Sequence, residues 1–266
     1  MKDINKHGLR RYIKASVRRE IRQHDGFGCI LCGSAIYTYE HIDPVFEEAT
    51  VHDPDKIALL CAGCHDRVTR GILSKETVKA AKKNPKCLRD GFSFGPFDIG
   101  AKYPIVKIGT LTVLETPKII SILDDSVLEI EPPEFEGGPF RLSALLSNAK
   151  GEEILRIDKN EWKTPTLNWD VEVKGARIIV RNALGDIAVI LRTDPPHSII
   201  LEQLNMYHRG ATITANVTTN SMEVTDSTGS SITAPGYTLG GCDTAIQVSS
   251  SGISFGLRCK IMGAGQ

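Results

Sequence analysis

Four cysteines stand in two matched pairs, Cys29 with Cys32 and Cys61 with Cys64, and each pair has the spacing Cys-x2-Cys. This spacing lets both sulfurs of a pair reach one ion about 2.3 Å away, and two pairs complete a tetrahedron. The alternative, four buried cysteines without a ligand, leaves the matched pairs unexplained. Zinc is the metal that such a set prefers, and a site closed by four sulfurs has a structural role. We therefore expect these cysteines to bind one structural Zn²⁺.

Three more side chains close to the pairs could carry out chemistry. Glu40 and His41 are neighbours between the two pairs, and His65 directly follows the last cysteine. Glu40 and His65 could hold a second, hard divalent ion such as Mg²⁺ or Mn²⁺, with water and a substrate phosphate completing its shell. His41 could then take a proton from water as a general base. This is the equipment for metal-assisted phosphodiester hydrolysis, although a single histidine is more often structural.

Basic side chains surround these residues and could contact a phosphate backbone. Apolar residues recur at helical spacing in the segment GLRRYIKASVRREIRQH, which predicts a helix over residues 8–24 with arginines on its other faces. A solvated helix face is the competing interpretation. The candidate nucleic-acid contacts are Arg18, Arg19, Arg22, Lys56, Arg67 and Arg70.

The elements that must position this chemistry are short. The β-branched and aromatic run SAIYTYE predicts a strand over residues 34–40, with His41 at its end before Asp43-Pro44. A helix is expected to begin at Cys64, and a second helix over residues 75–83 can be capped by Ser74. A strand–loop–helix fold around the zinc would bring the strand end and the helix start together.

These segments together resemble the HNH endonuclease family. The resemblance covers about residues 10–75 and is carried by RREIRQHDGFGCILCG, YEHIDP and KIALLCAGCHDRVTRG. It implies a ββα-metal core with two zinc knuckles and DNA as the partner. In that family the residue at the place of His41 is the general base, and those at the places of Glu40 and His65 bind the catalytic ion.

The sequence departs from the family pattern at two positions. Glu40 stands where the family usually has Asp, so the carboxylate lies one methylene further out. Lys56 stands where the family usually has an Asn or His that helps to hold the loop and the base. Lys56 could instead contact phosphate, with His52 or Asp55 taking the supporting role. His52, like His24, is otherwise expected at the surface.

Composition and charge limit the class of protein. The 266 residues are 41% hydrophobic and 24% charged, as in ordinary soluble globular proteins. The apolar runs fall far short of the roughly 20 residues that a membrane span needs. The first residues lack the apolar stretch of a secretory signal, which favours the cytoplasm, where thiols stay reduced. We therefore expect no membrane partner and three unpaired cysteines, Cys87, Cys242 and Cys259.

The net charge of zero hides a division of the chain. Residues 1–90 carry 17 Lys and Arg against 12 Asp and Glu, whereas residues 91–266 carry 15 against 20. A basic first third suits a polyanionic partner. The chain is thus expected to be α+β, with a nuclease domain at 1–90, a Gly- and Phe-rich linker at 91–103 and an all-β accessory domain at 104–266.

Turn signals at steps of eight to twelve residues predict that the last region is a β sandwich, or in part a solenoid in its Ser- and Thr-rich tail. Three functions compete. The first is a DNA-cutting HNH nuclease. The second is a zinc-stabilised DNA-binding module without catalysis. The third is an assembly or sensor protein, self-associating through the β region, that restrains the nuclease as restriction or antiviral defence would require.

Overall fold

The computed structural model describes residues 3–259, and the chain divides into two compact units. Unit 1 consists of Met1–Gly95 together with Lys163–Glu172, and unit 2 consists of Pro96–Trp162 together with Val173–Gln266. The sequence predicted a first domain at 1–90. The sequence of the segment Lys163–Glu172 has no local feature that would indicate its place in unit 1.

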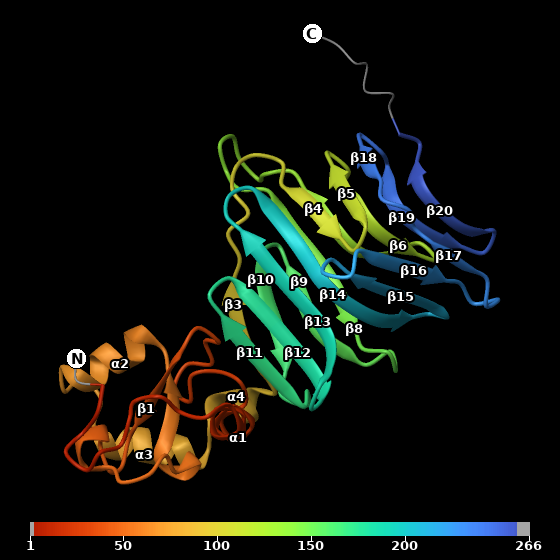
Figure 1. Cartoon of the computed structure of the whole chain (residues 1–266). Helices are drawn as coiled ribbons and strands as arrows, with labels where there is room; N and C mark the ends of the chain where they lie inside the picture. The colour runs from red at the N-terminus through yellow and green to blue at the C-terminus, as the bar shows by residue number, and fades with distance from the viewer. Residues whose placement is uncertain (1–2, 260–266) are drawn as a thin grey trace. The chain divides into compact units, whose positions relative to one another are not determined.

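Unit 1 combines short helices with one small sheet (Figure 1, red to orange). Its elements before the first crossing to unit 2 are α1 (Ala15–Asp25), β1 (Thr38–His41), the 3-10 helices η1 (Phe46–Glu48) and η2 (Pro54–Lys56), β2 (Ile57–Leu60), α2 (Ala62–Thr69), α3 (Lys75–Lys83) and α4 (Lys86–Asp90). Strands β1 and β2 are antiparallel, with Thr38 opposite Leu60 and His41 opposite Ile57. Helix α2 begins directly after β2.

Two of these elements are shorter than the sequence predicts. Helix α1 begins at Ala15 instead of residue 8. In the segment before it, Oδ1 of Asn5 accepts hydrogen bonds from the backbone N–H groups of His7 and Leu9, at 3.0 and 2.9 Å. The predicted strand over 34–40 begins only at Thr38 in β1. Its first residues bond elsewhere, since the N–H of Ala35 donates to the carbonyl of Phe94 at 2.8 Å.

Strand β2 lies at the centre of the unit 1 core, and all four of its residues are buried. Successive side chains of a strand point to opposite faces. Ile57 and Leu59 pack with Ile21 of α1, whereas Ala58 and Leu60 pack in a cluster that includes Cys64 and Val78. Because both faces of β2 are covered, its sequence is a continuous apolar run instead of an alternating one.

Unit 2 contains strands and loops but no helix over residues 96–162 and 173–259 (Figure 1, yellow to blue). Three strands, β3, β10 and β11, are divided between the two units. The strands from β3 onward are β3 (Phe92–Pro96), β4 (Ile105–Ile108), β5 (Leu111–Leu114), β6 (Lys118–Ile122), β7 (Asp125–Glu131), β8 (Arg141–Ser147), β9 (Glu153–Asp158), β10 (Glu161–Pro165), β11 (Asp170–Lys174), β12 (Arg177–Ala183), β13 (Asp186–Asp194), β14 (Ser198–His208), β15 (Ala211–Asn216), β16 (Ser221–Thr225), β17 (Ser231–Thr233), β18 (Thr238–Gly240), β19 (Thr244–Ser249) and β20 (Gly252–Leu257). The chain as a whole is therefore mixed α+β and mostly β.

The strands of unit 2 form two sheets. One has the order β20-β19-β6-β7-β8-β9-β10, and the other includes β12-β13-β14-β15-β16-β17, with β4 pairing with β14 and β5, and β18 with β5. Strand β19 is parallel to β6, and β18 is parallel to β5, so that the end of the chain joins strands from the start of the unit. The tail thus extends both sheets, by parallel pairing of β18 and β19 with earlier strands and by the antiparallel hairpins β16–β17 and β19–β20.

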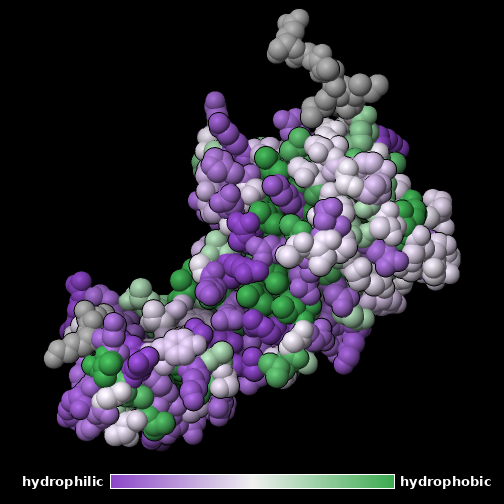
Figure 2. All heavy atoms as spheres, viewed as in Figure 1, coloured by the Kyte–Doolittle hydropathy of each residue, from purple (hydrophilic) through white to green (hydrophobic). Residues whose placement is uncertain are grey.

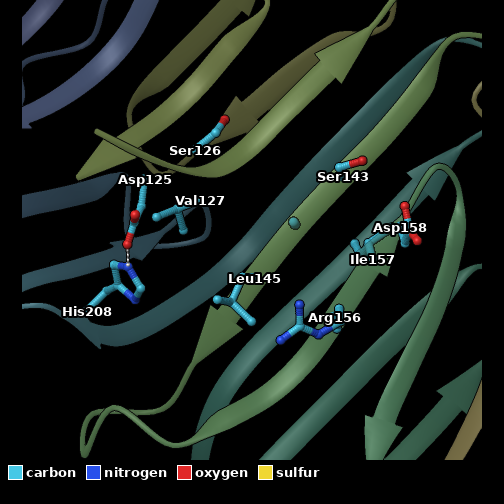
Figure 3. A pocket seen from close by; sticks show the side chains of 10 residues that line it. Asp125, Ser126, Val127, Ser143, Leu145, Arg156, Ile157, Asp158 and His208 are labelled. Carbon is cyan, nitrogen blue, oxygen red and sulfur yellow. Dashed lines mark hydrogen bonds and ion pairs between the residues drawn. The ribbon is translucent and has the colours of Figure 1, made fainter. Parts of the chain in front are cut away.

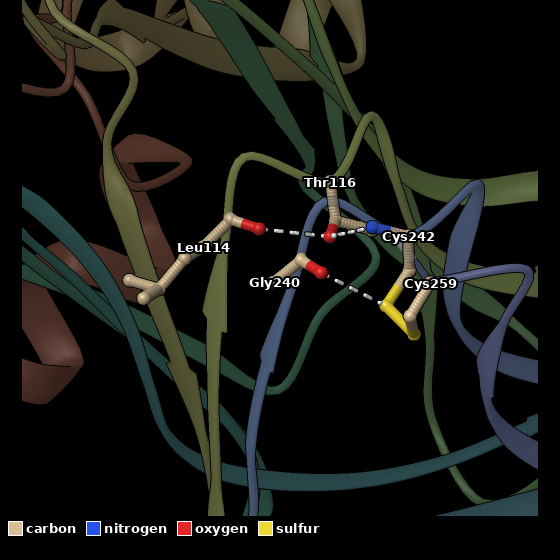
Figure 4. Close-up of a disulfide and its surroundings, with 5 residues drawn as sticks. All are labelled: Leu114, Thr116, Gly240, Cys242 and Cys259. Atoms are coloured by element: carbon tan, nitrogen blue, oxygen red, sulfur yellow. Dashed lines mark hydrogen bonds between the residues drawn. A yellow bond between two sulfur atoms is a disulfide. The ribbon is translucent and has the colours of Figure 1, made fainter. Parts of the chain in front are cut away.

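A disulfide joins Cys242 to Cys259 in unit 2 (Figure 4), which corrects the expectation that both are unpaired. The hairpin of β19 and β20 pairs Thr244 with Leu257 and thereby brings together the cysteines that flank its strands, with their Cα atoms 3.7 Å apart. The backbone N–H of Cys242 also donates to Oγ1 of Thr116 at 3.2 Å. Cys87 is a buried free thiol, as expected.

Between residues 3 and 259, no helix is both long enough and apolar enough to cross a bilayer.

Candidate metal centre and active site

The four paired cysteines lie together in unit 1. Their sulfur atoms are all within 4.8 Å of one another, and no other group of three or more metal-binding side chains occurs among residues 3–259. A tetrahedral zinc with Zn–S bonds of about 2.3 Å would separate its sulfurs by about 3.8 Å. The Sγ atoms of Cys32 and Cys61 are 3.5 Å apart. This donor set fits a zinc ion.

Local backbone geometry shapes both halves of the cluster. In the first half, the N–H of Cys29 donates to the carbonyl of Ser34 and the N–H of Gly33 donates to the carbonyl of Cys29, each at 2.8 Å. A Cβ atom at Gly28 would lie 2.7 Å from the Gly33 carbonyl, so the tight turn requires glycine there. In the second half, Cys61 caps α2, and its sulfur accepts from the N–H of Cys64 at 3.4 Å.

The electrostatics of the cluster differ from one sulfur to the next. A hydrogen bond with Cys32 lowers the pKa of Cys29 to about 5, and burial raises the pKa of Cys64 to about 12. A coordinated thiol is deprotonated outright, so zinc binding would release the protons that these thiols hold.

Glu40 and His65 are brought together beside this cluster. Nε2 of His65 lies 3.6 Å from Oε2 of Glu40, and the side chains are 48% and 34% exposed. Thr38, on the same face of β1, donates from its hydroxyl to Oε1 of Glu40 at 3.2 Å. Position and exposure suit a site that would exchange ions with solvent. One carboxylate and one imidazole would leave the other positions of a hard divalent ion to water and phosphate.

His41 has a different partner. Its Nε2 lies 3.1 Å from Nδ1 of His52, and Nε2 of His52 lies 2.8 Å from the backbone carbonyl of Arg10. The His41 ring also packs edge-on against Phe46, with centroids 5.4 Å apart. Burial, followed by the charges of His52 and Arg11, lowers the pKa of His41 to about 4. Of the two supporting residues considered from the sequence, the structure places His52 against His41.

Neither Lys56 nor Asp55 has a side-chain contact with His41 among the hydrogen bonds and ion pairs of the described residues; each has another partner. The side chain of Lys56 is exposed, but its backbone carbonyl accepts from the N–H of Ile42 at 2.9 Å. Lys56 therefore holds the loop after His41 through its backbone. A carboxylate oxygen of Asp55 lies 3.5 Å from Nδ1 of His24, which is exposed as expected.

Arg22 is not available to a phosphate backbone, contrary to the sequence-based expectation. Its side chain is 3% exposed, and its Nε and Nη2 donate to the two carboxylate oxygens of Asp170, each at 2.8 Å. Nη1 donates to the hydroxyl of Tyr39 at 2.9 Å. The partner comes from the segment that returns to unit 1, which helical periodicity around Arg22 cannot indicate.

The other arginines of α1 are only partly accessible. Arg19 is 22% exposed; its guanidinium lies 4.9 Å from the centre of the Trp169 ring, and its Nε lies 3.7 Å from Asp170. Arg18 is half-buried, with its guanidinium 5.7 Å from the centre of the Tyr12 ring. These contacts hold both side chains along the protein surface.

Arg67 and Arg70 lie on α2 beyond His65, and both are exposed. Arg70 forms an ion pair at 3.0 Å with Asp66, one turn earlier on the helix. Together with Lys56, these residues are the most accessible of the six candidate nucleic-acid contacts. Arg67 and Arg70 lie in and directly after α2, the helix that carries His65, and Lys56 ends η2, which holds the loop after His41.

Unit 2 contains a separate open cavity of about 440 Å³ on the face of β7, β8 and β9 (Figure 3). At its edge, Nε2 of His208 lies 2.8 Å from Oδ2 of Asp125, and Arg209 lies 3.1 Å from the other carboxylate oxygen. The hydrogen bond with His208 is the largest cause that lowers the pKa of Asp125. The contact with His208 joins the end of β14 to the start of β7.

The residues that sequence reasoning missed are Asp170 and, in part, His52. Neither residue belongs to a spaced motif. The sequence indicated only His52, because Lys56 stands where the family has an Asn or His and another residue could take over the supporting role. No protein-family model, no curated protein and no solved structure matches this chain.

Proposed function

We propose that this chain is a metal-dependent endonuclease of the HNH type that hydrolyses phosphodiester bonds in DNA. The observation that carries the proposal is the 3.6 Å approach of His65 to Glu40, next to a cluster of four cysteines and one residue from His41. Three separate parts of the expected motif thus meet in a small region. The resemblance of residues 10–75 to that family supports the same conclusion.

The fold of unit 1 supports the proposal as well. The antiparallel pair β1 and β2 is followed directly by α2, which is the order of a ββα-metal core. Cys61 and Cys64 at the start of α2 would share one zinc with Cys29 and Cys32. This zinc would fix the first turn of α2 and thereby the place of His65 relative to the strand.

The roles of the side chains follow from their chemistry. His41 would accept a proton from the attacking water. Glu40 and His65 would hold a Mg²⁺ or Mn²⁺ ion, which supplies Lewis-acid stabilisation of the phosphate and the leaving oxygen. The exposed Lys56 and Arg67 would neutralise neighbouring phosphates.

The test is incubation of supercoiled plasmid with the full chain and Mg²⁺ or Mn²⁺, with and without EDTA. We expect nicking that needs the divalent ion and that His41→Ala abolishes, while zinc content and DNA retention stay unchanged. His24→Ala is the matched control, because His24 is an exposed histidine of the same unit, paired with Asp55 and outside the proposed site. Cleavage by His41→Ala at the wild-type rate would refute the proposal.

A zinc-stabilised DNA-binding module without catalysis is the second candidate. It is favoured by Lys56 at the place of the family Asn or His, and by the engagement of the His41 Nε2 atom with His52 at 3.1 Å. DNA retention without nicking in any divalent metal would support this function over the nuclease.

We also propose that unit 2 mediates self-association and restrains the nuclease. Large apolar side chains are exposed in this unit, among them Leu184 at 75%, Phe135 at 67% and Tyr237 at 47%. On the face shown in Figure 2, green residues form several separate patches among hydrophilic ones. The solution mass at micromolar concentration tests the proposal, since a strict monomer would contradict it.

A further inference from the structure

Three groups in unit 1 form a chain of hydrogen bonds that ends at His41. The carbonyl of Arg10 lies 2.8 Å from Nε2 of His52, and Nδ1 of His52 lies 3.1 Å from Nε2 of His41. Both distances are those of ordinary hydrogen bonds. The first group in this chain is a backbone carbonyl, which can only accept.

The position of each proton follows from that carbonyl. Nε2 of His52 must donate, because the carbonyl of Arg10 has no proton to give. A neutral imidazole carries one N–H, so Nδ1 of His52 is the acceptor. Nε2 of His41 must then donate to it, which leaves the lone pair of His41 on Nδ1. We propose that His52 is a positioning residue that fixes His41 in the Nε2–H tautomer and leaves Nδ1 as its basic atom.

Packing around His52 keeps this arrangement in place. Asn5 donates from its side-chain amide to the carbonyls of Phe46 and Ala49, at 2.6 and 2.7 Å, and so fastens the N-terminal segment to the loop that precedes His52. The guanidinium of Arg11 lies 4.4 Å from the centre of the Phe46 ring. Phe46 in turn packs against His41. The segment that supplies the Arg10 carbonyl is therefore held at both sides.

The inference adds a role to the proposed nuclease. A general base needs its lone pair at a defined atom, and the neighbour of an imidazole decides which nitrogen carries the proton. It rests on the proposed function only where His41 Nδ1 is said to take a proton from water. The tautomer itself can be measured without any cleavage.

Two substitutions of His52 separate positioning from simple attachment. In His52→Asn, the amide oxygen stands close to the place of Nδ1 and can accept from His41, but the contact with Arg10 is lost. In His52→Gln, the amide nitrogen stands close to the place of Nε2 and can donate to Arg10, but the acceptor for His41 is displaced. Zinc content of each full-length variant shows that unit 1 has folded.

We expect His52→Gln and His52→Phe to lower kcat for plasmid nicking by at least about tenfold, because His41 loses both its fixed tautomer and its fixed orientation, with KM for DNA unchanged. His52→Asn is expected to retain kcat within about threefold, because the acceptor for His41 is kept. Rescue by Gln together with failure of Asn would show that His52 only attaches the N-terminal segment, and would overturn the proposal.

Nitrogen-15 NMR of the zinc-loaded full chain gives the independent readout. We expect His41 to carry its proton on Nε2 in the wild type and a mixture of tautomers in His52→Phe. A wild-type His41 protonated on Nδ1 would overturn the inference, whatever the nuclease assays show. The expected tautomer combined with full activity of His41→Ala would instead overturn the proposed function and leave the inference standing.

Discussion

Arg22 and Asp170 form a two-point ion pair inside unit 1, although 148 residues separate them in the chain. Both contacts are 2.8 Å long, and the side chains are 3% and 0% exposed. The pair fastens α1 to the segment that returns from unit 2. Buried charges are costly to desolvate, and here each guanidinium contact is matched by an oxygen of Asp170 or Tyr39.

Removing one member of this pair should destabilise unit 1. Arg22→Ala removes both 2.8 Å hydrogen bonds to the buried Asp170 carboxylate and leaves the Arg19 contact at 3.7 Å, so the free energy of unfolding should fall by about 3–5 kcal/mol. The double variant Arg22→Met with Asp170→Leu should lose less, because it leaves no buried charge. Urea unfolding of each variant measures this, with Arg70→Ala, from an exposed pair, as the control. If Arg22→Ala left the stability unchanged and weakened DNA binding, Arg22 would contact phosphate after all.

Zinc removal should unfold unit 1 and spare unit 2. The cluster of four cysteines lies in the core beside β2, and a small unit with so few apolar residues depends on its metal. We expect one zinc per chain, lost in Cys64→Ser, and hydrogen exchange that rises after chelation in residues 3–95 and 163–172, the two parts of unit 1. Cys87→Ser is the matched control, because Cys87 is also buried but lies outside the cluster. Equal loss of zinc from both variants would contradict the assignment.

Changes at the exposed pair Glu40 and His65 should affect the divalent-ion requirement of cleavage and leave zinc binding intact. His65→Ala removes one of the two proposed protein ligands, so the Mn²⁺ concentration that gives half-maximal nicking should rise at least about tenfold, a factor expected for a lost ligand interaction of about 1.4 kcal/mol. Titration of nicking against Mn²⁺ measures this shift. Asp66→Asn, at the next residue, should leave the titration where it is; an equal shift there would implicate the helix surface in general.

DNA affinity should depend on Arg67 and Lys56 through charge. Each contact with a phosphate releases counterions, so Arg67→Ala should reduce the slope of log affinity against log salt by about 1. Lys56→Ala is expected to behave in the same way. Binding to a catalytically inactive His41→Ala background measures the slope without cleavage. Lys150→Ala, an exposed change in unit 2, is the control and should leave the slope as it was.

Reduction of the Cys242–Cys259 disulfide should weaken unit 2. Opening a loop of 17 residues should lower its free energy of unfolding by about 3 kcal/mol, chiefly by freeing the unfolded chain. Urea unfolding with and without a reductant measures the change, and Cys259→Ser should show the reduced stability in both conditions. Identical curves for the oxidised and reduced wild type would contradict this expectation.

The features that the sequence by itself determined are local ones. The Cys-x2-Cys pairs indicated the sulfur cluster because two positions three apart can reach one ion. Ser74 as a capping residue indicated the helix over residues 75–83, which is α3, and the Ser74 hydroxyl caps its first turn at 3.0 Å. Turn residues at short steps correctly indicated that the last part of the chain is β. In each case the signal and the structure involve residues only a few positions apart.

The tertiary structure decided the contacts between distant residues. Arg22 has the composition and spacing of a solvated helix arginine, and only the return of residues 163–172 to unit 1 supplies Asp170 and buries it. His41 meets His52 because two loops and the N-terminal segment pack together. Cys242 meets Cys259 because a hairpin aligns the residues outside its strands. Local periodicity reports on neighbours along a helix or strand, whereas these pairings depend on the path of the whole chain.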